Sequence, residues 1–244
     1  MSTKRRPLIS CVIPVLNGEA YIGETLDSIA AQTYRPLQIV VIDDGSTDRT
    51  AEIVRAHAGQ ILYHYQENRG IAAACNRGID MASGEFVAFL DADDLWPARK
   101  LALQMARFDA RPELDYCVGH AQNFWMPELA QEEEQFKDHP RSRPVPGYVC
   151  GSLMARKKTF ETVGGFDESL RHGYDTDWYL RARQSGCVEE AMPDVLLLRR
   201  VHKQNRSRMH AGRSHGEYLR LLKQNLDRRR RSAATDSEDD KTSS

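Results

Sequence analysis

Three carboxylates follow an apolar run in the segment 86–97. Asp91 and Asp93 are separated by one residue, so in an extended chain their side chains point to the same side. Two neighbouring carboxylates repel each other unless a cation neutralises them, and Mg²⁺ and Mn²⁺ favour such oxygen ligands. These ions usually bring a phosphate with them. The alternative is a solvated loop in which Asp94 caps a helix that opens near Pro97.

The apolar run before these carboxylates is the last of four predicted strands that alternate with helices. The strands are predicted at 8–15, 37–42, 61–65 and 85–90, and the helices at 20–32, 48–58 and 71–82. Such alternation implies right-handed crossovers and a mainly parallel sheet. Ligands of such sheets bind beyond the carboxyl ends of the strands.

Polar residues follow three of these strands. They occupy 17–19 after the first strand, 43–48 after the second and 91–94 after the fourth. Packing hardly explains polar groups gathered at one edge of one sheet. The pattern therefore indicates a pocket for a nucleotide or a phosphate.

The second half of the chain is less regular. Helices are predicted at 101–108, 177–185 and 217–226, and a strand at 195–201. The charged, proline-bearing segment 131–146 is predicted to be a mobile loop. The tail 228–244 has four arginines followed by acidic residues, lacks apolar residues, and is predicted to be disordered.

Composition narrows the class of protein. The 244 residues are 41% hydrophobic and 28% charged, with a formal net charge of −1, which predicts a soluble globule and no general attraction to nucleic acid. No stretch approaches the roughly 18 apolar residues that span a bilayer, although peripheral membrane contact stays open. The five cysteines are scattered without a CxxC pair. They indicate reduced thiols in a cytoplasmic protein rather than a disulfide or zinc framework.

Taken together, the motifs resemble family 2 of the inverting glycosyltransferases, which carry the GT-A fold. The matching stretches are 13–19, 28–34, 41–48, 68–70, 74–79, 89–94 and 163–168. The resemblance is dense over 10–103 and patchier over 150–207. It implies an α/β fold with a Rossmann-like, mainly parallel sheet flanked by helices. We expect one domain over 1–226, with a nucleotide-sugar half at about 8–111, an acceptor and catalytic-base half at about 112–226, and a charged tail over 227–244.

The resemblance implies a donor site around an Asp-x-Asp motif. Asp93 is expected to ligate Mn²⁺ or Mg²⁺, and Asp91 to share the metal or hold the ribose. Bound metal would neutralise charge on the departing nucleoside diphosphate. The other implied nucleotide-sugar residues are Pro14, Val15, Glu19, Asp44, Arg69, Asn76 and Ala92. Asp44 matches the position that binds the nucleobase, Asp43 is expected to be structural, and for Asn76 a bond to its own scaffold is equally expected.

An inverting transfer needs a general base that takes the proton of the acceptor hydroxyl. Family register implies Asp175 in this role. Tyr174 stands where the family usually has Glu, a departure that bears on acceptor geometry. Asp177 is expected to be an N-cap or first-turn carboxylate of the following helix.

Basic residues lie at the end of the predicted strand 195–201 and just beyond it. His202 is expected to be either a metal ligand or a structural or phosphate-contacting histidine. Arg200, together with Arg206 further on, could pair with the diphosphate.

The expected function is transfer of a sugar from a nucleotide-diphosphate sugar to an acceptor hydroxyl by single displacement. UDP is favoured over GDP and dTDP, and the acceptor is a glycan, lipid, peptide or small molecule. The Gln-x-x-Arg-Trp signature of processive synthases is absent, which favours one sugar per encounter. Two alternatives remain. One is a non-catalytic nucleotide-sugar-binding protein, suggested by Tyr174. A nucleotidyltransferase is disfavoured because no glycine- and lysine-rich phosphate loop follows the first strand.

Overall fold

The computed structural model describes residues 5–205 and Lys223. Arg206, the tail and, apart from Lys223, the helix expected at 217–226 lie outside the described residues. The expected domain boundary near 226 falls there too.

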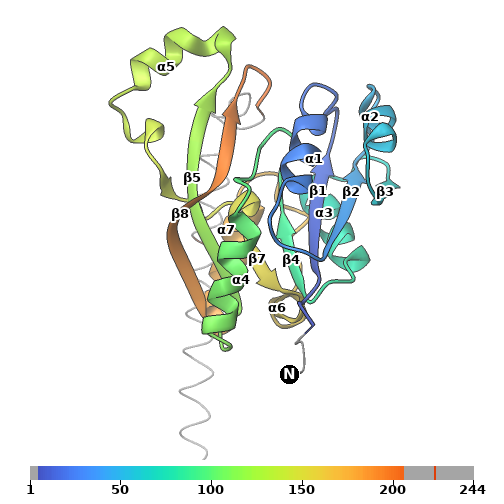
Figure 1. Cartoon of the computed structure of the whole chain (residues 1–244), viewed down its shortest axis with the longest axis vertical. Helices are drawn as coiled ribbons and strands as arrows, with labels where there is room; N and C mark the ends of the chain where they lie inside the picture. The colour runs from blue at the N-terminus through green and yellow to red at the C-terminus, as the bar shows by residue number, and fades with distance from the viewer. Residues whose placement is uncertain (1–4, 206–222, 224–244) are drawn as a thin grey trace, which may run out of the picture.

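A mixed sheet of eight strands forms the centre of the molecule (Figure 1). The order is β3-β2-β1-β4-β7-β5-β6, and β8 pairs with β5. The strands are β1 (Ile9–Val15), β2 (Leu37–Asp43), β3 (Ile61–Tyr65), β4 (Phe86–Phe89), β5 (Tyr116–Trp125), β6 (Val145–Pro146), β7 (Met154–Arg156) and β8 (Glu189–Val201). The first four are parallel, β7 is antiparallel to β4 and β5, and β8 is parallel to β5.

Helices cover both faces of this sheet. The α-helices are α1 (Ile22–Ala30), α2 (Thr50–Ala56), α3 (Ile71–Met81), α4 (Lys100–Ala110), α5 (Ala130–Phe136), α6 (Lys157–Val163) and α7 (Tyr174–Gln184). Short 3-10 turns are η1 (Pro127–Leu129), η2 (Pro140–Ser142) and η3 (Cys150–Ser152). Buried side chains of α1, α2 and α4 form one core cluster, and those of α3, α6 and α7 form a second.

Strand β1 separates the two cores. All seven of its residues are buried. Side chains alternate along a strand, so Cys11 and Ile13 join the α1 side while Val12 joins the α3 side. Helix α3 comes close at Gly78, where a Cβ atom would lie 2.1 Å from Val12 Cγ1. Burial on both faces explains why this strand is apolar except for Ser10.

The elements predicted in the first half are confirmed, with small shifts at their ends. The segment 131–146, expected to be a mobile loop, is not a loop throughout, because it contains most of α5, η2 and the strand β6 that pairs with β5. Helix α5 lies beyond the end of β5 in Figure 1 and buries no residue. Strands β5 and β7 were not expected. No helix in the described part is long and apolar enough to cross a membrane.

Candidate functional site

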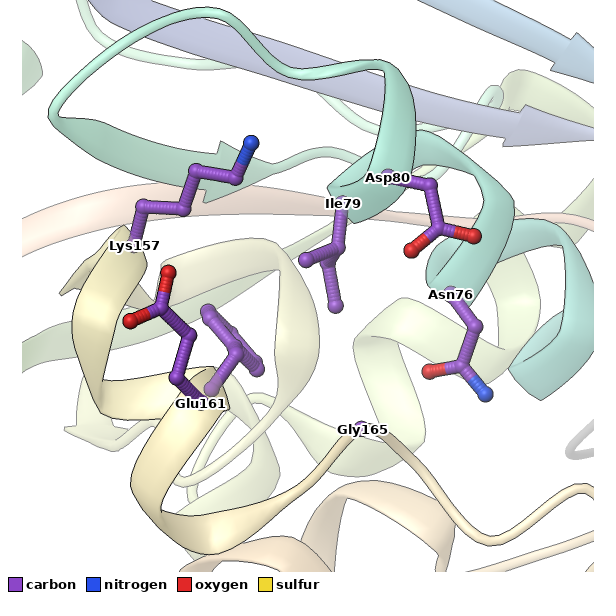
Figure 2. Close-up of a pocket in the computed structure, with 7 residues that line it drawn as sticks. Asn76, Ile79, Asp80, Lys157, Glu161 and Gly165 are labelled. Atoms are coloured by element: carbon purple, nitrogen blue, oxygen red, sulfur yellow. The ribbon is translucent and has the colours of Figure 1, made fainter.

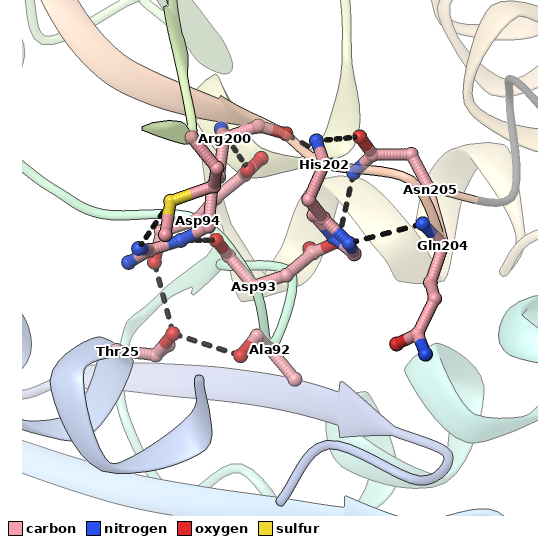
Figure 3. A network of polar contacts seen from close by, with 9 residues as sticks. Thr25, Ala92, Asp93, Asp94, Arg200, His202, Gln204 and Asn205 are labelled. Carbon is pink, nitrogen blue, oxygen red and sulfur yellow. Dashed lines mark hydrogen bonds and ion pairs between the residues drawn. The ribbon is translucent and has the colours of Figure 1, made fainter. Parts of the chain in front are cut away.

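The loop after β4 is held against β8 at the carboxyl edge of the sheet. Leu95 and Leu198 exchange two main-chain hydrogen bonds, of 3.0 and 2.9 Å. This bridge brings the end of β8, and His202 just beyond it, to the carboxylates that follow β4. Residues about 110 positions apart therefore share one site, as Figure 3 shows.

His202 and Asp93 are in direct contact. The distance from His202 Nε2 to Asp93 Oδ2 is 3.0 Å. Asn205 Nδ2 donates to the same carboxylate oxygen at 3.2 Å, and Asn205 Oδ1 accepts from the His202 main-chain N–H at 2.6 Å. The Gln204 main-chain N–H points at His202 Nδ1 from 3.3 Å, and the Tyr21 ring lies 4.7 Å from the imidazole. The imidazole is thus held with Nε2 toward Asp93.

The spacing of this pair fits part of a divalent-metal site, whereas the contact itself is a hydrogen bond, so His202 Nε2 would have to lose its proton to bind a metal ion. Adjacent ligands of an octahedral ion with bonds of about 2.0–2.1 Å lie about 3 Å apart, which matches the separation of His202 Nε2 and Asp93 Oδ2. Within the described residues, no group of three or more His, Cys, Asp or Glu side chains is arranged to hold a metal. Further ligands would have to come from a bound phosphate or from water.

Asp94 is buried rather than solvated. Its Oδ1 accepts the Arg200 main-chain N–H at 2.8 Å. Burial, followed by the charges of Asp93 and Asp91, raises its pKa well above the ordinary value. The capping alternative for Asp94 was wrong, because α4 begins after Arg99 and has no side-chain cap.

The Arg200 guanidinium is also turned inward. It is 3% exposed and donates from Nε to the Asp93 carbonyl at 2.8 Å and from Nη2 to Glu24 at 2.8 Å. These contacts occupy the group that was expected to meet a diphosphate.

Asp43, the last residue of β2, and Asp44, which follows it, hold neighbouring segments in place through hydrogen bonds. Asp43 accepts from Ser46 N at 2.7 Å and from the Tyr63 hydroxyl at 2.6 Å, as expected of a structural residue. Asp44 accepts from Gln66 Nε2 and from the main-chain N–H groups of Arg69 and Gly70, at 2.8–2.9 Å. A carboxylate has about four acceptor positions, so one remains on Asp44 Oδ2. Its role toward a nucleobase stays a prediction.

The other residues expected to bind the nucleotide sugar lie at or just after the ends of β1 and β4. Pro14 and Val15 are buried at the end of β1. Glu19 is exposed, and its Oε2 accepts the Arg49 main-chain N–H at 3.1 Å. The Ala92 carbonyl accepts a hydrogen bond from the Thr25 hydroxyl at 2.9 Å, which anchors the loop after β4, residues 90–98, to α1.

Asn76 grips the main chain of a distant loop. Its Oδ1 accepts from Phe166 N at 2.8 Å and its Nδ2 donates to Phe166 O at 2.9 Å. Glu168 receives both Asn76 Nδ2 and Arg69 Nη2, at 3.1 and 3.0 Å. Asn76 and Gly165 also line a cavity of about 520 Å³ beside α6 (Figure 2). These contacts favour the scaffold alternative for Asn76.

Asp175 lies in the first turn of α7, which begins one residue earlier, at Tyr174. Its Oδ1 accepts from Thr176 N at 2.8 Å and its Oδ2 from Cys150 N at 3.3 Å. Burial raises its pKa, against the lowering effect of these N–H groups. A raised pKa makes a carboxylate a stronger base at neutral pH. Asp177, as expected, is also in the first turn, where it pairs with Arg181 at 2.7 Å.

The charges of Asp175 and of Asp91, the first residue of the Asp-x-Asp motif, act on two common groups, the Cys150 thiol and the Tyr174 hydroxyl. Burial, then a hydrogen bond with Cys75, raises the pKa of the Cys150 thiol well above its ordinary value, and the charges of Asp91 and Asp175 both add to this. The same two carboxylates raise the pKa of Tyr174, after burial and the two thiols. The charges of Asp91 and Asp175 thus act on the same two groups. Tyr174 itself is 8% exposed, with its ring 5.3 Å from that of Phe166.

Sequence reasoning missed three residues of this site. Glu24 carries no motif signal, and Asn205 lies in a stretch that resembles the family but was given no role, since each acts through a partner more than 100 residues away. Cys150 contributes its main-chain N–H, which no side-chain pattern reveals. The pairing of β8 with β5 and the bridge to Leu95 bring Asn205, and Arg200 as the partner of Glu24, to the loop after β4.

Comparisons with known proteins identify the family of the chain. The family described as Glycosyl transferase family 2 matches residues 10–166. An uncharacterized glycosyltransferase of Rickettsia typhi is 33% identical over 208 residues, covering 80% of this chain and 64% of the relative. A PGL/p-HBAD biosynthesis glycosyltransferase of Mycobacterium bovis is 31% identical over 188 residues, covering 72% of this chain and 69% of the relative.

Solved structures share the fold. S. aureus TarS 1–349 in complex with UDP superposes with a TM-score of 0.66 at 21% identity, covering 79% of this chain and 60% of that chain. The mannosyltransferase PcManGT from Pyrobaculum calidifontis, in complex with GDP-Man and Mn²⁺, gives a TM-score of 0.63 at 26% identity, covering 85% and 61%. This chain spans about two thirds of the length of such relatives. With its family match over most of the described residues and a sheet of this topology, the chain belongs to glycosyltransferase family 2 and has the GT-A fold.

Proposed function

We propose that this chain transfers a sugar from a nucleotide-diphosphate sugar to an acceptor hydroxyl, with inversion and with the help of a divalent metal. The observation that carries the proposal is the contact of Asp93 Oδ2 with His202 Nε2 at 3.0 Å, at the carboxyl edge of the sheet. It supplies two donor atoms at octahedral spacing beside Asp91. Bound metal would neutralise charge on the departing nucleoside diphosphate.

Asp175 is the proposed general base. Its carboxylate would take the proton of the acceptor hydroxyl as that oxygen attacks the anomeric carbon and the bond to the nucleoside diphosphate breaks. Attack on the face opposite the leaving group inverts the anomeric configuration. The N–H groups of Thr176 and Cys150 orient the carboxylate, and burial strengthens it as a base.

The donor class is supported by the solved relatives. TarS has been solved with UDP and with UDP-GlcNAc, and PcManGT with GDP-Man and Mn²⁺. We propose a UDP sugar as the first donor to test, with GDP and dTDP sugars next. The carboxylate of Asp44, at the end of β2, would accept a ring N–H of uracil or guanine.

A donor panel tests this function. UDP-GlcNAc, GDP-mannose and dTDP-glucose would each be incubated with the protein and Mn²⁺, and released nucleoside diphosphate would be quantified with and without EDTA. We expect slow, EDTA-sensitive hydrolysis of one donor. Proton NMR during the first turnovers would show the β-anomer of the sugar if the α-linked donor reacts with inversion.

Two other outcomes would change the account. Release of the α-anomer would contradict inversion. Metal-dependent binding of a donor, with no release of nucleoside diphosphate alone or with a panel of hydroxyl acceptors, would favour the binding-only alternative. Tyr174 places a buried aromatic ring where the family usually has Glu. In that case Tyr174→Glu would be the first variant to test for restored transfer.

A further inference from the structure

We infer that Arg200 is a positioning residue that holds the Asp93 carboxylate in place for the metal, an inference that rests on the proposed function. Its guanidinium is buried, at 3% exposure, and lies between the Tyr21 ring at 4.5 Å and the Phe124 ring at 5.0 Å. A cation removed from water is costly unless its donors are used. Its contacts show where those donors are used.

Arg200 holds the loop after β4 at two successive residues. Its Nε donates to the Asp93 carbonyl at 2.8 Å, while its main-chain N–H donates to Asp94 Oδ1 at 2.8 Å. One residue of β8 therefore fixes both the main chain of Asp93 and the carboxylate that follows it (Figure 3).

A second route reaches the Asp93 carboxylate itself. The Arg200 carbonyl accepts from Asn205 Nδ2 at 3.0 Å, and the same amide nitrogen donates to Asp93 Oδ2 at 3.2 Å. Arg200 is thus connected to Asp93 at its carbonyl and, through Asn205, at the oxygen that faces His202. Fixing both ends of the residue leaves its side chain little rotational freedom.

Glu24 anchors the other end of the guanidinium. Arg200 Nη2 donates to Glu24 Oε2 at 2.8 Å, which links β8 to α1. A planar guanidinium can meet the Asp93 carbonyl and Glu24 at once because its donors form a rigid fork. A lysine ammonium is a single point donor at the end of a flexible stem, so it can replace the charge but not the two directed contacts.

The chain offers a matched control in Arg156. Its Nε and Nη2 donate to the carbonyls of Leu114 and Pro112, at 2.8 and 3.0 Å, and it lies over the rings of Phe86 and Phe108. Like Arg200, it donates to main-chain carbonyls and lies over two aromatic rings, but these contacts include no carboxylate such as Glu24. Arg156 is the last residue of β7 and pairs with Phe86 at the start of β4, whereas the loop that holds Asp93 follows the other end of β4.

The test compares Arg200→Lys with Arg156→Lys in the full chain. Hydrogen exchange would be followed in peptides covering 90–98, and Mn²⁺ binding in the presence of UDP, GDP or dTDP by electron paramagnetic resonance. We expect Arg200→Lys to speed exchange in 90–98 about tenfold and to weaken Mn²⁺ binding about 10- to 100-fold. Arg156→Lys should leave both within about twofold of the wild type, even at an equal loss of unfolding free energy.

The inference is overturned if Arg200→Lys matches the wild type in both measurements, or if Arg156→Lys weakens Mn²⁺ binding equally. Should Arg200→Lys fail to fold, Glu24→Gln replaces it, because it keeps Arg200 and removes one anchor. A smaller change in the same direction supports the inference, and no change overturns it. If the wild type does not bind Mn²⁺ in the presence of UDP, GDP or dTDP, the proposed function fails, and hydrogen exchange alone decides whether Arg200 holds the loop.

Discussion

At the scale of single residues, the environment of Asp175 suits the proposed role of general base. The charges of Asp175 and Asp91 both act on Cys150, and burial raises the pKa of Asp175. Asp175→Asn keeps the size of the side chain and removes the proton acceptor. We expect turnover to fall about 10²- to 10⁴-fold, while donor affinity by calorimetry stays within about threefold. Full turnover in this variant would refute the assignment.

The pH dependence of turnover follows from the same pKa. The base works only when ionised, and its pKa is raised above the ordinary 3.8. Activity should therefore be complete above the raised pKa and fall as the pH drops through it. We predict an acidic limb above pH 4 in the rate of donor hydrolysis, measured at saturating Mn²⁺. A rate that stays constant down to pH 4 would contradict this.

Residues of the site could be predicted where they belong to local motifs. Asp91, Asp93, Asp175 and His202 were all expected, and the structure places Asp93 and His202 in contact. Arg200 was expected to meet a diphosphate but is buried instead. A sequence shows which residues are charged, but burial of a cation depends on what packs around it.

At the scale of elements, the junction between α3 and the loop before α7 depends on one amide. The Asn76 side chain makes two hydrogen bonds with the main chain of Phe166, one to its N–H and one to its carbonyl. A Cβ atom on Gly165 would lie 2.5 Å from Asn76 Oδ1. We expect Asn76→Ala to lower the free energy of unfolding by about 1–3 kcal/mol, measured with urea.

A double-mutant cycle tests the same junction. Gly165→Ala should destabilise the wild type but cost much less in the Asn76→Ala background, because the oxygen that it would meet is gone. Equal costs in both backgrounds would show that the two residues are independent.

Helix α4 carries a buried lysine whose charge opposes folding. Lys100 is fully buried and its Nζ lies 3.9 Å from the centre of the Trp96 ring, with no hydrogen-bond partner among the described residues. Burial, offset in part by Cys11, Cys117 and Cys150, lowers its pKa from 10.5 to about 7. Between these values the unfolded chain binds more protons, so this residue makes stability rise as the pH increases from 7 to 10.5.

Lys100→Met should remove that dependence. At pH 6 the variant should be more stable than the wild type by a few kcal/mol, at about 1.4 kcal/mol for each pKa unit. The advantage should shrink steadily toward pH 10. Lys158→Met, at an exposed position of α6, should show no such trend. Denaturant unfolding at several pH values measures both, and a constant difference for Lys100→Met would contradict the prediction.

The elements of the first half could be predicted because each carries its own periodicity. Strand β1 is apolar except for Ser10, and α1 has one buried face. The outer part of β5 could not, because its six last residues are only half-buried and include His120, Gln122 and Asn123. Pairing with β8, which lies 70 residues further along the chain, is what makes this segment a strand.

At the scale of the whole molecule, the two halves meet at the carboxyl edge of one sheet. The first half contributes Asp91 and Asp93 after β4, and the second contributes His202 after β8 and Asp175 on α7. The family and fold could be predicted from motifs in order. The bridge between Leu95 and Leu198, which closes the site, could not, since neither residue belongs to a recognisable motif.

This arrangement implies that metal and nucleotide stabilise the folded chain together. A ligand present at 100 times its dissociation constant adds about 2.7 kcal/mol to the free energy of unfolding. Asp93 contacts His202 within the proposed site, whereas Asp80 is an exposed carboxylate of α3 beside the cavity in Figure 2. The two are therefore a matched pair for substitution by Asn.

The most direct measurement is thermal unfolding of the wild type, Asp93→Asn and Asp80→Asn with UDP or GDP and Mn²⁺, with and without EDTA. We predict that one nucleotide raises the Tm of the wild type and of Asp80→Asn only when Mn²⁺ is free, and leaves Asp93→Asn unchanged. No rise with either nucleotide, or an equal rise in Asp93→Asn or in EDTA, would contradict a metal-dependent donor site at this edge of the sheet.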